Sequence, residues 1–213
     1  MTSVSQASSL IKFDLSEVTA GNPDFQYSNG SFGTVDDGIA ATAGQQNSGF
    51  EFVGFLDALL TDVLDGASFT LTNVFADGAA QVNGSLVAQQ TTGGVFSLFD
   101  QDNNLLLEGE LSSGSLIGSR ESSSGSFFNT TFATFTAGSL LPLLVIDTAG
   151  LSIALGDILA AGTAGLKVTD GLLENFVAAG DGIVTGDQIP EPTTVLLLLS
   201  GLGGAFYFRR QSV

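Results

Sequence analysis

The chain has 213 residues, of which 44% are hydrophobic and 13% charged, so it can bury the core of one domain and is too apolar to be disordered throughout. Its formal net charge is -17, from 5 Lys and Arg residues against 22 Asp and Glu residues, which excludes nucleic acid as a partner because such a surface repels phosphate. The absence of Cys and His excludes disulfides, thiolate metal sites and catalysis by an imidazole base.

Residues 1–10 are predicted to be a disordered N-terminal segment. The stretch Met1 to Leu15 has neither the basic start nor the apolar run of a secretory signal peptide. We therefore expect that the natural start lies upstream or that a signal peptide has been removed.

Residues 11–179 are predicted to form an acidic all-β domain, because apolar residues recur at every second position. Two such sets are Phe69, Leu71 and Phe75, and Leu151, Ile153 and Leu155. A period of two is typical of half-buried strands. Further strand candidates are Ile11–Leu15, Val82–Gln89, Val95–Phe99, Asn104–Leu111, Phe127–Thr136 and Leu143–Asp147.

Turn signals separate these segments. The pairs Asn29-Gly30, Asp77-Gly78 and Asn83-Gly84 tolerate positive φ, and Ser112 to Ser126 is rich in Ser and Gly and is predicted to be a loop. Frequent turns between short strands favour an antiparallel β-sandwich or jelly roll.

One segment has helical spacing instead. Apolar residues from Phe55 to Leu64 recur every three to four positions, with Asp57 and Asp62 off that face and Gly66 as a stop. We predict one short helix that packs on the sheet, because its acidic polar face does not suit an anionic membrane surface.

A calcium site is a weak possibility at Asp100, Asp102 and Asn104, which have the alternate spacing of a calcium loop. An EF-hand loop would also need Gly at position 105 and Glu at position 111, and both positions are Leu. We therefore favour a turn between two strands and expect no cofactor beyond weakly bound calcium.

Glu108 and Glu110 are the carboxylate pair that a polysaccharide hydrolase would need. Leu107, Gly109 and Leu111 alternate with them, so both Glu side chains are expected on the outer face of a strand. A solvated surface is the simpler interpretation, and we expect no catalytic residues.

The C-terminal residues have a different character. Residues 180–189 are predicted to be a linker or edge strand, and Pro190, Glu191 and Pro192 precede an uncharged run over 193–208. At about 1.5 Å per residue this run is short for a bilayer but can span it marginally as a hydrophobic transmembrane helix. Arg209 and Arg210 end the run as a cytoplasmic stop, which leaves the rest of the chain outside.

This order of features, over residues 190–213, resembles the PEP-CTERM sorting signal of bacteria that make extracellular polysaccharide. The resemblance implies that an exosortase, a membrane-embedded cysteine protease or transpeptidase, recognises the tripeptide and cuts nearby. The protein would be anchored in the membrane before processing and would then lie at the cell surface or outside the cell. Extracellular polysaccharide is a further partner that we expect.

The sequence thus predicts a non-enzymatic exported protein that acts at the cell surface or in the extracellular matrix. The alternative is an extracellular carbohydrate- or calcium-binding module, which exposed aromatic rings on one sheet face or a carboxylate cluster would favour. A polysaccharide hydrolase is the weakest of the three interpretations.

Overall fold

The computed structural model describes residues 8–14, 23–36, 46–47, 49–52, 67–143 and 146–188. Within these ranges the chain is almost entirely β-structure, with a single 3-10 turn, η2 (Leu141–Leu143). The all-β prediction is confirmed. The helix predicted between Phe55 and Leu64 and the membrane helix predicted over 193–208 both lie outside the described residues.

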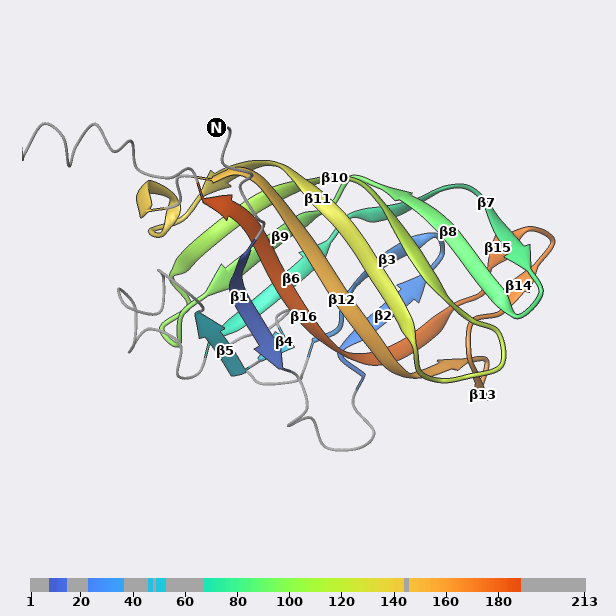
Figure 1. Cartoon of the computed structure of the whole chain (residues 1–213). Coiled ribbons are helices and arrows are strands. Elements are labelled where there is room, and N and C mark those ends of the chain that lie inside the picture. Colours follow the sequence, from blue (N-terminus) through green and yellow to red (C-terminus); the bar gives the residue numbers. More distant parts are fainter. Residues whose placement is uncertain are drawn as a thin grey trace, which may run out of the picture.

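Four long strands cross the molecule diagonally, as Figure 1 shows. They are β10 (Leu105–Ser119), β11 (Ser126–Ala137), β12 (Ile146–Ala160) and β16 (Phe176–Gln188). The shorter strands are β1 (Ser8–Asp14), β2 (Phe25–Ser28), β3 (Ser31–Thr34), β4 (Gln46–Asn47), β5 (Gly49–Phe52), β6 (Ser68–Thr72), β7 (Val74–Asn83), β8 (Leu86–Thr92), β9 (Val95–Phe99), β13 (Thr163–Ala164), β14 (Val168–Thr169) and β15 (Leu172–Leu173).

The main sheet closes on itself as a barrel. Its hydrogen-bonded order runs β11-β12-β16-β2-β3-β7-β8-β10, and β10 pairs again with β11. The two-sheet sandwich or jelly roll expected from the sequence is therefore wrong. A sandwich and a barrel are both built from strands with one buried face, so apolar residues alternate in the same way in each. The barrel is distinguished by the pairing of β10 with β11, which closes the sheet.

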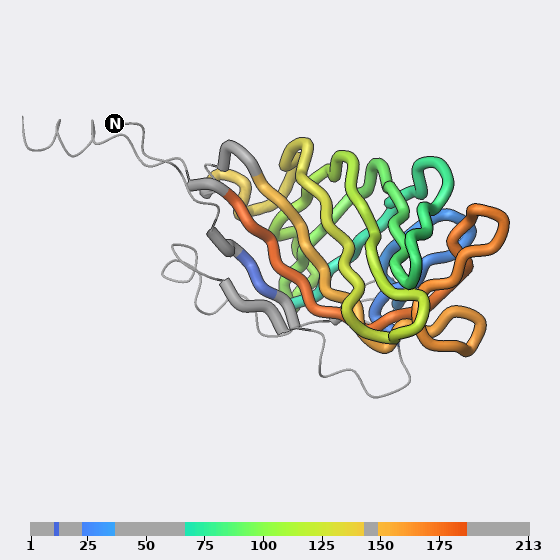
Figure 2. Tube along the Cα trace, turned by 45° about the vertical axis from the view of Figure 1, so that its right-hand side comes forward, coloured from blue at the N-terminus to red at the C-terminus, as the bar shows by residue number. Residues whose placement is uncertain are grey.

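A second set of short strands extends the barrel at its other end. β9, β6 and β4 continue from the first half of β10, while β1 and β5 continue from the second half of β16. The long strands run side by side through both sets, as the trace in Figure 2 shows. The four long strands therefore extend along the full length of the described β-structure.

Phenylalanine rings fill the interior. Phe25 stacks on Phe32 with ring centroids 5.6 Å apart, and Phe32 packs against Phe128 at 5.1 Å. Phe69 continues the cluster toward the end formed by β6 and β9, at 6.0 Å from both Phe25 and Phe96. These five side chains are fully buried, and burial of a large apolar side chain contributes about 1.5–3 kcal/mol each.

The strand alternation agrees with the sequence in one predicted set and changes phase in the other. Leu151, Ile153 and Leu155 are all buried. Phe69 and Leu71 are buried, but Phe75 is 50% exposed, so the prediction that all three share one face is wrong. Asn73 has φ 60°, a left-handed conformation that ends β6 and inverts the alternation in β7.

One predicted turn pair is confirmed: Asn29 and Gly30 both have positive φ in the turn between β2 and β3. The turn predicted at Asn83-Gly84 is one residue too early, because Asn83 ends β7 and the two-residue turn before β8 is Gly84-Ser85, with φ 62° at Gly84. That second turn divides the strand predicted over Val82–Gln89. Asp77-Gly78 is not a turn but lies within β7, where the pairing register shifts before Gln81.

Three segment predictions are corrected. Ser112–Ser119 belongs to β10 rather than to a loop, because pairing with both β8 and β11 outweighs its polar composition. Residues 8–10 belong to β1 rather than to a disordered segment. Residues 180–188 form a strand, but not an edge strand or a linker, because β16 lies between β12 and β1.

Candidate functional site

The calcium candidates lie in the turn between β9 and β10, as the turn interpretation requires. The Asp100 carboxylate accepts hydrogen bonds from the backbone N–H of Asp102 at 2.9 Å and of Asn104 at 2.8 Å. The Asn104 amide nitrogen also donates to it at 2.9 Å. The Asn104 side chain and these backbone donors hold the pKa of Asp100 below its usual value. The Asp100 carboxylate thus accepts the hydrogen bonds that the N–H donors of the turn offer. In the described part of the chain, no group of three or more Asp or Glu side chains is placed to hold a metal ion.

The predicted carboxylate pair has the orientation of a solvated face. Glu108 accepts hydrogen bonds from the Thr136 hydroxyl at 2.9 Å and the Ser97 hydroxyl at 3.2 Å. Glu110 is exposed, whereas Leu107, Gly109 and Leu111 between and beside the two are buried. The prediction that both Glu side chains point outward is confirmed.

Asp24 is a buried acid that the sequence did not single out. Its side chain is 0% exposed, and its Oδ2 accepts a hydrogen bond from the Gly180 N–H at 2.9 Å. Burial raises the pKa of Asp24 to about 6, and Asp181 adds to the rise while the Gly180 hydrogen bond opposes it. This carboxyl ties the start of β2 to β16.

A groove of about 340 Å³ lies over β8, β10 and β11. It is lined by Gln90, Ser113, Gly114, Ser115, Asn129, Thr130 and Thr131. The groove lies at a bulge, where two residues of β10, Ser112 and Ser113, face one residue of β11, Thr131. The Thr130 hydroxyl donates to the Ser113 carbonyl at 3.3 Å and holds this irregular backbone.

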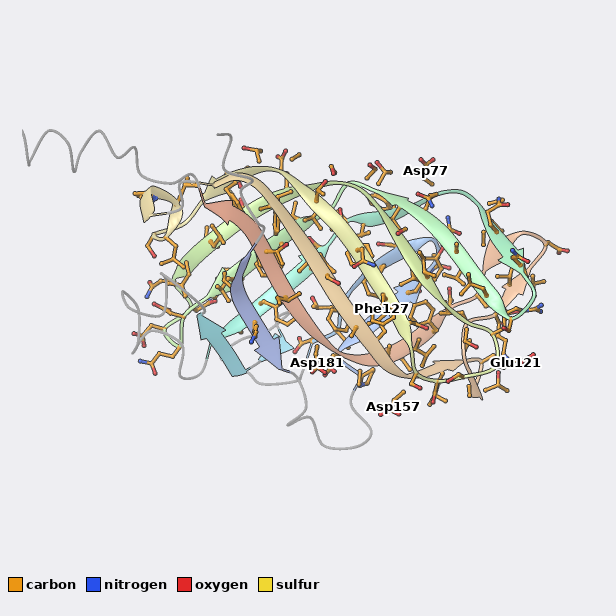
Figure 3. The ribbon with its side chains drawn as sticks, in the orientation of Figure 1. Asp77, Glu121, Phe127, Asp157 and Asp181 are labelled. Atoms are coloured by element: carbon orange, nitrogen blue, oxygen red, sulfur yellow. The ribbon has the colours of Figure 1, made fainter. Side chains whose placement is uncertain are left out.

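The outward side chains in and beside the groove form two parallel rows. In the first row Asp77, Gln90, Ser115, Asn129 and Ser152 are successive partners across β7, β8, β10, β11 and β12. In the second, Ala88, Ile117, Phe127 and Ala154 are partners in the same way. A polar row and an apolar row therefore lie side by side, and Figure 3 labels Phe127 on this face.

The sorting residues Pro190, Glu191, Pro192, Arg209 and Arg210 lie outside the described residues. The structure describes the chain up to Gln188, the last residue of β16. No helix in the described ranges has the length and apolar character needed to cross a membrane.

Sequence reasoning missed the groove because its residues come from three strands whose pairing the sequence does not specify. The available signal was the run of polar residues at outward positions on either side of Gly114. Without the strand order, nothing indicates that Gln90 and Asn129 lie on either side of Ser115. Asp24 was missed for the same reason, since Gly180 is 156 positions away.

The described residues thus define an all-β barrel with a groove lined by uncharged residues, and the sequence continues beyond it into a C-terminal segment of different composition. A family model of the PEP-CTERM protein-sorting motif matches residues 188–211. The chain carries this motif, which marks it as an exported, cell-surface-directed protein that an exosortase sorts. No curated protein and no solved structure matches the chain.

Proposed function

We propose that the barrel is the non-enzymatic cargo of this sorting signal and acts at the cell surface or in the extracellular matrix. The observation that carries the proposal is the motif match over residues 188–211, which begins at the last residue of β16. The folded barrel and the signal therefore meet without an intervening domain. An enzymatic role has no support from Glu108 and Glu110, whose side chains lie on an outer strand face.

In this proposal residues 193–208 form a hydrophobic helix that crosses the membrane, with Arg209 and Arg210 in the cytoplasm. Proline on both sides of Glu191 keeps the preceding tripeptide extended, because proline lacks the amide donor and restricts the residue before it. An extended segment at the membrane surface is a suitable substrate for a protease cleft. The exosortase then cuts near Pro190, and the barrel is released or reattached.

Mass spectrometry of the native surface or secreted protein tests the cleavage. In a host with an exosortase, the mature chain should end close to Pro190 and lack Arg209 and Arg210. A variant with Pro190→Ala, Glu191→Ala and Pro192→Ala should keep its C-terminus, whereas the control Gln211→Ala should be cut like the wild type. Recovery of intact Val213 from the mature wild-type pool would refute cleavage and indicate a permanent single-pass anchor.

A further inference from the structure

We propose that the groove over β8, β10 and β11 binds a neutral polysaccharide, with exposed Phe rings beside it as platforms for the sugar rings. This inference goes beyond sorting, because it assigns a ligand class to the barrel itself. The groove residues are uncharged, can form hydrogen bonds, have a well-held backbone and lie beside exposed aromatic rings.

The groove lacks charged side chains, which disfavours ionic ligands of either sign. None of its seven lining residues is ionisable, although the chain carries a net charge of -17. The polar row that crosses the groove ends at Asp77, which pairs with Gln90 and would repel an anionic ligand. A cation finds no carboxylate ligand within the groove. A neutral ligand is therefore favoured.

The hydrogen-bonding groups of the groove match sugar hydroxyls. Among the described residues, the Gln90 carboxamide and the Ser115 hydroxyl have no hydrogen-bond partner. Asn129 accepts a hydrogen bond from Ser152 at 2.6 Å through Oδ1, which leaves its amide nitrogen to donate elsewhere. Carboxamides and hydroxyls supply both donors and acceptors, as a sugar hydroxyl also does. Three adjacent strands thus present unused polar groups to one ligand.

The backbone of the groove is held by side-chain hydrogen bonds and close strand contacts, so binding requires no rearrangement of the strands. Gln89, which is 1% exposed, donates from its amide nitrogen to the backbone carbonyls of Asp77, Gly78 and Gln90. This fixes the backbone beneath the Gln90 side chain. A Cβ at Gly114 would lie 2.6 Å from the Asn129 carbonyl oxygen, so β10 and β11 approach closely there.

Aromatic rings lie at two corners of this surface. Phe127 is 45% exposed and lies two positions from Asn129 on the same face of β11. Phe75 is 50% exposed and pairs with Thr92, at the corner next to Asp77 and Gln90. The C–H face of a sugar ring is attracted to the negative face of an aromatic ring, while its hydroxyls bind polar groups. A polar groove between exposed rings fits this two-sided chemistry.

Affinity electrophoresis of the full-length chain in mild detergent tests the proposal. The gels contain hydroxyethyl cellulose, dextran or galactomannan as neutral probes, and alginate as an anionic one. We expect at least one neutral polysaccharide to retard the wild-type chain and alginate to leave it unaffected. Absence of retardation by every neutral polysaccharide, or equal retardation by alginate, would overturn the proposal.

Matched variants locate the site. Phe127→Ala, Phe75→Ala and Gln90→Ala should each weaken binding by about tenfold. Two controls should stay within about twofold of wild type: Leu172→Ala, at an apolar residue 66% exposed on β15, and Gln81→Ala, at an exposed glutamine on β7. Circular dichroism confirms that each variant is folded. Wild-type affinity in both Phe variants would refute the role of the Phe rings in binding sugar rings. Equal weakening by the two control substitutions would refute the assignment of the binding site to the groove.

The electrophoresis reports binding whether or not the tail is processed. Failure of binding therefore leaves the sorting proposal intact, and failure of cleavage leaves the binding proposal intact.

Discussion

The backbone N–H of Gly180 donates a hydrogen bond of 2.9 Å to the Asp24 carboxylate. This contact joins β16 to the start of β2, and it places an acid where burial disfavours its charge. The position of one proton is therefore coupled to the stability of the barrel.

Asp24→Asn should change the pH dependence of unfolding. Because burial raises the pKa of Asp24 from 3.8 to about 6, the native state holds a proton that the unfolded state has lost between these values. The free energy of unfolding of the wild type should fall by about 3 kcal/mol as the pH rises across this window. Asparagine keeps an acceptor for Gly180 and carries no charge, so this loss should be absent in the variant.

Urea unfolding of the full-length chain from pH 4 to pH 8 measures the effect. The control is Asp157→Asn, at an exposed residue whose φ of 48° asparagine tolerates. The control should retain the wild-type slope. Parallel stability curves for the wild type and Asp24→Asn would contradict the coupling.

Gly138→Ala should destabilise the barrel strongly. Gly138 has φ 115°, and a Cβ there would lie 2.3 Å from the Leu106 carbonyl oxygen, which is backbone and cannot move aside. We expect a loss of about 2–4 kcal/mol in the free energy of unfolding. Gly156→Ala is the matched control, because no atom lies within 4 Å of its added Cβ, and it should change stability by less than about 0.5 kcal/mol. Equal stability of the two variants would contradict this account.

The β9–β10 turn should depend on Asp100 and respond little to calcium. Asp100→Ala removes the acceptor for the N–H groups of Asp102 and Asn104 and should cost about 1 kcal/mol, whereas Asp102→Ala should be nearly neutral. Because the pKa of Asp100 is lowered, its contribution is present above pH 3.8 and is lost as the pH falls further. Millimolar calcium should raise Tm only slightly at constant ionic strength, and a micromolar stoichiometric site in calorimetry would disprove this.

The orientation of the tail is tested on intact spheroplasts that retain the unprocessed chain. External protease should digest the barrel and spare the segment that ends in Arg209 and Arg210, because paired arginines favour the cytoplasmic side. Replacing both arginines with glutamine should weaken this preference while the apolar run stays unchanged. A barrel protected from external protease in the wild type would rule out the proposed orientation.

Local chemistry in the sequence predicts the strands and several turns. The alternation at Leu151, Ile153 and Leu155 and the pair Asn29-Gly30 each depend only on neighbouring residues. Closure of the barrel could not be predicted in this way, because it depends on which strand pairs with β10. A single left-handed residue, Asn73, was enough to place Phe75 outside.

The candidate sites likewise differ in whether their residues are contiguous in the sequence or are brought together by strand pairing. The sorting motif is contiguous and could be identified from its residues, and the family model agrees with it. The groove depends on the register of Gln90, Ser115 and Asn129 across three strands, which only the folded chain supplies. The Asp100 turn lies between these cases, since its residues are close in sequence but their role depends on which donors reach the carboxylate.

The position of β16 has a mechanical consequence. Gln188 is its last residue, and the strand is hydrogen-bonded on one side to β12 and on the other to β1. Hydrogen bonds between antiparallel strands run across the strand axis, so tension on the chain beyond Gln188 loads both ladders in shear. Many bonds must then break together, whereas a strand peeled from one end loses them one at a time. If the barrel were held by its C-terminal end, the load would therefore enter through a strand that is hydrogen-bonded to a neighbour on each side.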